Sequence, residues 1–125
     1  QQVRDNVEYA FETVGLTALA DCPPQHLSIG HKRAAAIAAV LSVTPQIITF
    51  DQPDGSLDLR NRRKLEEVID NLSQTLIVAT CDTRFAAAVS DRAIVIDQGR
   101  IIADGPTQSI LNDRDLMESH GLETP

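Results

Sequence analysis

The sequence contains few aromatic residues, few cysteines and no long hydrophobic run. There is no tryptophan, and aromatic residues make up only 3% of the 125 residues, so a core must be built from Ile, Leu, Val and Ala. Cys22 and Cys81 form no C-x-x-C pair, so we expect no stabilising disulfide and a cytoplasmic location. The longest apolar run, Ala34 to Leu41, is too short to cross a bilayer. Any membrane role is therefore expected to be indirect, through a partner.

Charge and composition exclude further classes of function. Acidic residues outnumber basic ones by 18 to 11, and the net charge of −7 disfavours nucleic acids and anionic lipids as partners. Cys22, His26 and His31 have a spacing that matches no standard zinc pattern, so we expect no metal centre there. A chain of this length fits a single domain over residues 1–125 that buries roughly two-thirds of its surface on folding.

Apolar periodicity and breaker residues predict alternating helices and strands. We expect an α/β fold with a three-layer, partly parallel sheet, helices on both faces and an antiparallel C-terminal hairpin, in which the first two strands are buried on both faces. We divide the domain into a helical region (1–45), an α/β core half (46–112) and a C-terminal tail (113–125). The predicted helices are 3–14, 28–41, 59–72, 83–89, 107–111 and 113–120, and the predicted strands are 46–50, 75–80, 93–97 and 100–103.

Two short segments indicate a phosphate-related site. In the first, Leu27 to Arg33, Ser28 is expected to cap a helix whose free N–H groups suit an anion, although an ordinary capped helix has the same pattern. In the second, Ile47 to Pro53, a strand ends in Asp51 and so places a carboxylate at the sheet edge where ligands of α/β proteins bind.

In this order, the segments resemble the signature and Walker B motifs of ABC-transporter ATPase domains, a P-loop NTPase fold. The likeness covers nearly the whole chain, which resembles the second half of such a domain. It is strongest to the ATPase subunits of cobalt/nickel-type energy-coupling importers, through Val14 to Leu16, Pro23 to Ser28 and Asp97 to Pro106.

The resemblance assigns the signature residues a role toward ATP. In the family, the signature of one subunit closes over ATP held by another. Ser28 and Gly30 keep two contacting positions, whereas Ile29 replaces a glycine and His31 replaces a glutamine. The resemblance therefore implies a weakened phosphate clamp at these four residues.

The resemblance also implies roles for residues that follow the strands. Asp51 matches the aspartate that supports magnesium through water, and Gln52 replaces the glutamate that activates water. An amide cannot accept a proton, so a contribution of roughly a hundredfold is lost. Cys81 replaces a histidine that touches the γ-phosphate. Asp58 matches the D-loop at the dimer interface, or simply caps the next helix.

The phosphate-binding loop of the family is missing from this sequence. No G-x-x-x-x-G-K-[ST] pattern occurs, so we expect no cofactor for the chain alone, and magnesium-ATP only if a partner supplies that loop. In the family, the strand before the loop lies between those resembling 75–80 and 93–97. We expect a gap there, closed by direct strand pairing or by exchange of elements in a homodimer.

Three functions remain open. The first is a degenerate ATPase-like fragment without hydrolysis, acting as an oligomerising module or as a partner of an intact ABC ATPase subunit. The second is the C-terminal part of a working ATP-binding subunit of a metal-ion importer. The third is a module that binds an anion at Ser28 to Gly30 without turnover.

Overall fold

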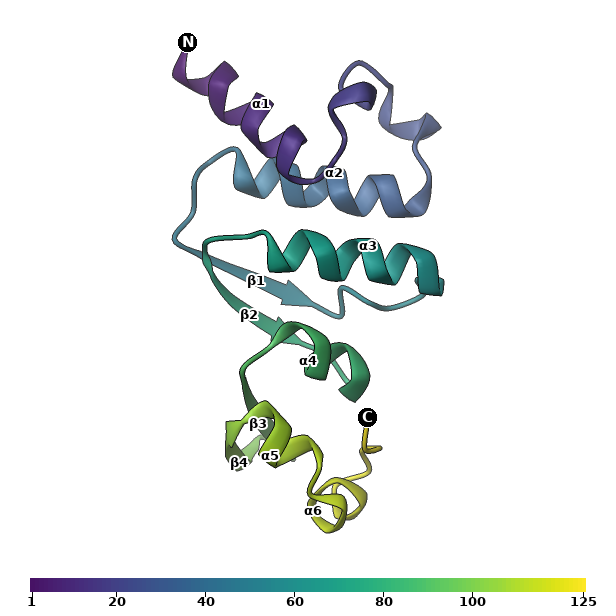
Figure 1. Cartoon of the computed structure of the whole chain (residues 1–125), viewed down its shortest axis with the longest axis vertical. Coiled ribbons are helices and arrows are strands. Elements are labelled where there is room, and N and C mark those ends of the chain that lie inside the picture. The colour runs from purple at the N-terminus through teal and green to yellow at the C-terminus, as the bar shows by residue number, and fades with distance from the viewer. The chain divides into compact units, whose positions relative to one another are not determined.

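The computed structural model describes all residues 1–125, which form two compact units (Figure 1). The first contains Gln1–Phe50 and Ser56–Ile77, and the second contains Asp51–Gly55 and Val78–Pro125. These boundaries differ from the regions 1–45, 46–112 and 113–125 expected from the sequence. That the chain is one folding domain stays a prediction.

The first unit is mainly helical and contains most of the first two strands. Its elements are α1 (Gln2–Thr13), the 3₁₀ turns η1 (Thr17–Leu19) and η2 (Pro24–His26), α2 (Ile29–Leu41), β1 (Ile47–Asp51), α3 (Leu59–Asp70) and β2 (Thr75–Ala79), of which β1 and β2 end in the second unit. Gly15 follows α1 with a φ of +69°, a conformation that glycine adopts without steric cost. On α2, Ile37, Ala38 and Leu41 form the buried stripe, as their spacing predicts.

Strands β1 and β2 pair in parallel. Near their start the N–H of Thr75 donates to the carbonyl of Gln46 (3.0 Å), and at their end the N–H of Gln52 donates to the carbonyl of Ala79 (2.8 Å). Ile48 is buried, with 4% of its surface exposed, whereas Ile47 and Ile77 are 58% and 57% exposed.

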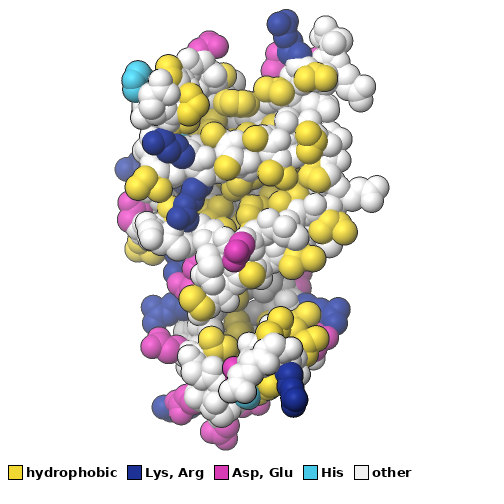
Figure 2. Space-filling model, turned by 180° about the vertical axis from the view of Figure 1, so that it is seen from behind, with side chains coloured by type: hydrophobic (Ala, Val, Ile, Leu, Met, Phe, Trp, Pro, Cys, Tyr) yellow, Lys and Arg dark blue, Asp and Glu magenta, His cyan; other side chains and the backbone are white.

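The prediction that these strands are buried on both faces is therefore wrong. Residues of a strand alternate between its two faces, and in this structure one face of β1 is covered while the other stays open. Figure 2 shows many hydrophobic side chains exposed on the unit that contains α1 to α3, in the upper part of the view. An open apolar face of this kind is typical of a surface that binds further protein.

The second unit consists of a hairpin and three short helices. Its elements are α4 (Thr83–Val89), β3 (Arg92–Asp97), β4 (Arg100–Pro106), α5 (Thr107–Leu111) and α6 (Arg114–Ser119). Val95, Leu111 and Met117 form its core, so the segment expected to be a tail contributes a fully buried methionine. The ring of His120 also lies against Asp97, with Nδ1 and Oδ2 2.9 Å apart.

The hairpin turn follows from two residues in the left-handed region. Gln98 and Gly99 have φ values of +46° and +74°, which matches the twist of a two-residue connection between antiparallel strands. The predicted α/β class with parallel strands and an antiparallel C-terminal hairpin is confirmed.

The strands form two separate sheets. β2 is hydrogen-bonded only to β1, and β3 only to β4, so the expected interruption between β2 and β3 is present. The prediction that β2 and β3 pair directly and so close this gap is wrong. That the gap is closed by an exchange of elements in a dimer stays a prediction. No helix is long and apolar enough to span a membrane.

An ion pair on the hairpin predicts how stability depends on pH. Arg92 donates from Nε and Nη2 to both carboxylate oxygens of Asp104 at 2.7 Å, and these hydrogen bonds hold the pKa of Asp104 below its ordinary value. Because the folded pKa lies below the unfolded one, the pair stabilises the fold above about pH 4 and loses its effect as pH falls further.

We therefore expect Asp104→Asn to lower the melting temperature at about pH 7 and to have no effect at about pH 2. The shift at neutral pH will be small because the pair is exposed to solvent. Asp21→Asn, in an exposed loop, is the control and should show no such pH dependence. An equal loss at both pH values for Asp104→Asn would contradict this role of the pair.

Candidate functional site

The signature segment begins a capped helix. The Ser28 Oγ accepts a hydrogen bond from the N–H of His31 at 3.2 Å, which satisfies one of the free donors of the first turn of α2. Ile29, at the position of a glycine in the resembling family, projects its side chain outward and is 66% exposed. A bulky apolar group therefore stands at the helix end that the sequence predicts to approach phosphate.

Gly30 has a packing role within the chain. A Cβ added at this position would lie 2.6 Å from Oδ1 of Asn61, so an alanine here would force the Asn61 side chain to move. Asn61 is held in turn by Asp58, whose Oδ1 accepts from the Asn61 N–H (2.8 Å) and whose Oδ2 accepts from Nδ2 (3.0 Å). Asp58 thus caps α3. Asn61, which was not predicted from the sequence, lies between Asp58 and Gly30 of the signature segment.

A cavity of about 330 Å³ lies beside this contact, between the end of α1 and the helices α2 and α3. Ile37 and Leu65 contribute to its apolar wall, and Gly30, His31 and Asn61 line it on the signature side. Asp51, Gln52 and Cys81 do not line it, and they belong to the second unit.

The other predicted site residues meet where β1 and β2 end. The Cys81 thiol lies 3.6 Å from Oε1 of Gln52 and donates to it, so the two positions expected to differ from a working ATPase are in contact. Gln52 has a φ of +46°, an uncommon conformation for a residue other than glycine. Asp51, Gln52 and Cys81 are all exposed.

Asp51 is the residue expected to support a magnesium ion. No group of three or more His, Cys, Asp or Glu side chains is arranged to hold a metal ion. Magnesium prefers several oxygen ligands in octahedral geometry and commonly takes some of them from phosphates. That Asp51 supports magnesium through water when nucleotide is bound stays a prediction.

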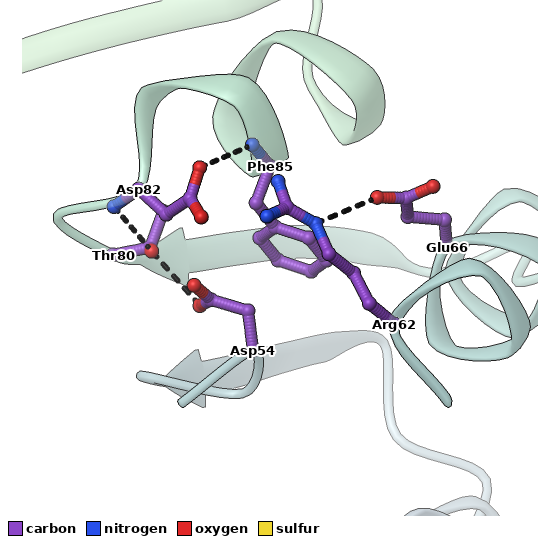
Figure 3. Close-up of polar contacts among 6 residues, drawn as sticks. All are labelled: Asp54, Arg62, Glu66, Thr80, Asp82 and Phe85. Carbon is purple, nitrogen blue, oxygen red and sulfur yellow. Dashed lines mark hydrogen bonds and ion pairs between the residues drawn. The ribbon is translucent and has the colours of Figure 1, made fainter. Parts of the chain in front are cut away.

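A chain of hydrogen bonds fixes the loops around Gln52 and Cys81 (Figure 3). The Thr80 hydroxyl donates to Oδ1 of Asp54 (2.8 Å) and accepts from the N–H of Asp82 (3.0 Å). The carboxylate of Asp82 accepts from the N–H of Phe85 (3.0 Å) and so caps α4. The sequence analysis missed this network. The place of Asp82 just before a helix signals its capping role, whereas no local pattern links Asp54 with Thr80.

The sequence of this chain is similar to those of known transport proteins. No protein-family model matches the chain. It is 48% identical, over 99% of its length, to a putative ABC transporter ATP-binding protein of Synechocystis sp., of which the match covers 44%. The chain is a homologue of ABC transporter ATP-binding proteins. It spans about half the length of the curated relatives that it matches.

Further matches include energy-coupling proteins. The chain is 37% identical, over its whole length, to the energy-coupling factor transporter ATP-binding protein EcfA of Carboxydothermus hydrogenoformans, of which the match covers 47%. Among solved structures, CbiO1 of Clostridium perfringens, part of the transporter complex CbiONQ, superimposes with a TM-score of 0.82 at 28% identity over 93% of this chain and 48% of that one.

A putative metal-chelate type ABC transporter in an inward-facing conformation superimposes with a TM-score of 0.86 over 94% of this chain and 48% of that one. Its 21% identity supports the fold alone. The recognition of an ABC ATPase-like chain with likeness to energy-coupling subunits is confirmed by these comparisons.

The contact between Gly30 and Asn61 predicts a strong coupling of two substitutions. Gly30→Ala should destabilise the chain by about 1 kcal/mol, because the added methyl group displaces Asn61 from Asp58. In an Asn61→Ala background the same change should be neutral or should stabilise by up to about 1 kcal/mol, because alanine favours a helix over glycine. Urea denaturation of the four variants measures both effects. An equal effect of Gly30→Ala in the two backgrounds would show that the contact has no energetic role.

Proposed function

We propose that this chain supplies the signature and Walker B half of an ATP-binding subunit of an ABC transporter, and that it neither binds nor hydrolyses ATP alone. The observation that best supports this is the meeting of Asp51, Gln52 and Cys81 at the ends of β1 and β2, in a chain 48% identical to a putative ABC transporter ATP-binding protein. Asp58 and the capped signature helix complete the set of matching positions.

The unpaired edges of the two sheets support the proposal that this chain acts with a phosphate-loop half. β2 and β3 each have a hydrogen-bonded neighbour on one side only, and Ile47 and Ile77 expose an apolar face. We propose that a strand of the phosphate-loop half pairs with these strands and that its helix covers the open face. That half would also provide the backbone N–H groups and the lysine that hold the β- and γ-phosphates.

Slow turnover is the second part of this proposal. Gln52 has an amide where a proton acceptor is needed, and Cys81 has a thiol where the family has an imidazole. General-base assistance is commonly worth a hundredfold or more, so an assembled site with Gln52 should hold ATP longer than it cleaves it. Such a subunit, acting with a phosphate-loop half, corresponds to the second function inferred from the sequence, with turnover slowed at Gln52 and Cys81.

Likeness to EcfA and CbiO1 favours an energy-coupling importer as the setting. In that setting the chain would act at the cytoplasmic face and reach the membrane only through its partners. An alternative is a homodimer with exchanged elements, which the open apolar faces of β1 and β2 favour. Light scattering distinguishes the two, because a monomer at high concentration would exclude the homodimer.

The proposal predicts that ATP binding needs both halves. Calorimetry of the chain alone with magnesium-ATP should show no binding up to about 1 mM nucleotide, a limit of about −4 kcal/mol. Mixing the chain with the phosphate-loop half of the Synechocystis relative should restore binding, since that half provides the missing triphosphate contacts.

Asp51→Asn serves as the control in the mixture and should weaken the binding of magnesium-ATP but not of ATP without magnesium. Gln52→Glu should raise the slow hydrolysis of the mixture by about a hundredfold, since a carboxylate accepts the proton that an amide cannot. Release of orthophosphate by the chain alone, at a rate abolished by Asp51→Asn, would overturn the proposal.

A further inference from the structure

The contact between Cys81 and Gln52 follows from the backbone. The N–H of Gln52 donates to the carbonyl of Ala79, two residues before Cys81, so the parallel pairing of β1 and β2 fixes which residues meet at the sheet edge. The left-handed conformation of Gln52 (φ +46°) then ends the strand and turns the chain into the following loop.

The two loops are joined on either side of this contact. Thr80 and Asp82 flank Cys81, and both belong to the hydrogen-bond chain that reaches Asp54, two residues after Gln52 (Figure 3). The backbone segments that carry the Cys81 thiol and the Gln52 amide therefore cannot move apart without breaking the hydrogen bonds of Thr80.

We propose that Cys81 is a positioning residue for Gln52. The thiol donates to Oε1 of the amide at 3.6 Å, which turns the amide oxygen toward Cys81 and leaves the NH₂ group available to meet a ligand. Because an amide N–H donates to phosphate oxygens and takes no proton from water, the pair favours retention of an anionic phosphate over its cleavage. This consequence for nucleotide rests on the proposed function, whereas the contact itself does not.

Thiol reactivity tests the contact in the chain alone. Cys22→Ser leaves Cys81 as the one cysteine, and its reaction with neutral iodoacetamide is followed at a fixed pH. Gln52→Ala should speed the reaction about two- to fivefold, because the side chain that contacts the sulfur at 3.6 Å is removed and the thiol becomes more accessible to the reagent.

Gln98→Ala is the matched control, because Gln98 is exposed and has the same φ of +46° in the hairpin turn. It should leave the rate unchanged. Equal rates for the parent and Gln52→Ala would overturn the proposal, as would the same acceleration by Gln98→Ala.

The second test uses the mixture with the phosphate-loop half. Cys81→Ala and Gln52→Ala should each weaken ATP binding severalfold. The double variant should bind ATP no more weakly than the weaker-binding of the two single variants, because both residues act through the same amide. Cys81→Ser, which keeps a donor, should restore most of the affinity. Additive losses would mean that the two residues act independently and would contradict the positioning role. If the parent mixture binds no ATP at all, the proposed function fails, and the reactivity series still decides whether the residues are paired.

Discussion

Parallel pairing of β1 with β2 is the constraint on which the candidate site depends. It sets Gln52 beside Ala79 and thereby brings Cys81 to the same sheet edge, although the two side chains are 29 residues apart in sequence. The Asp54–Thr80–Asp82 bonds then join the loops that follow the strands. A change that shifted the register of β1 and β2 would move Cys81 away from Gln52.

The same strands leave edges and an apolar face without a neighbour. Each of the two sheets has two strands, and isoleucines on β1 and β2 remain open to solvent. Exposed strand edges and apolar faces are costly for a protein that acts alone, because they invite association. These surfaces, together with matches that cover 44% and 48% of two related proteins, are the basis of the proposal that the chain acts with a phosphate-loop half.

Local patterns predicted most elements of the fold because they depend on nearby residues. The cap at Ser28, the turn at Gln98 and Gly99 and the buried stripe of α2 each follow from residues within a few positions of each other. Burial of β1 and β2 on both faces was predicted wrongly, because an apolar run does not reveal whether a second layer is present. Contacts between distant segments were also missed, as for Asn61 against Gly30, since no short motif encodes them.

Hydrogen exchange of the backbone amides of β2 and β3 tests most directly whether these sheets are completed by the phosphate-loop half. In the chain alone, the amides on the unpaired edges should exchange rapidly. On addition of the phosphate-loop half of the Synechocystis relative, the account predicts strong protection of both strands, while the amides of β4 that already pair with β3 change little. Unchanged exchange in β2 and β3 under conditions in which the two halves bind each other would contradict it.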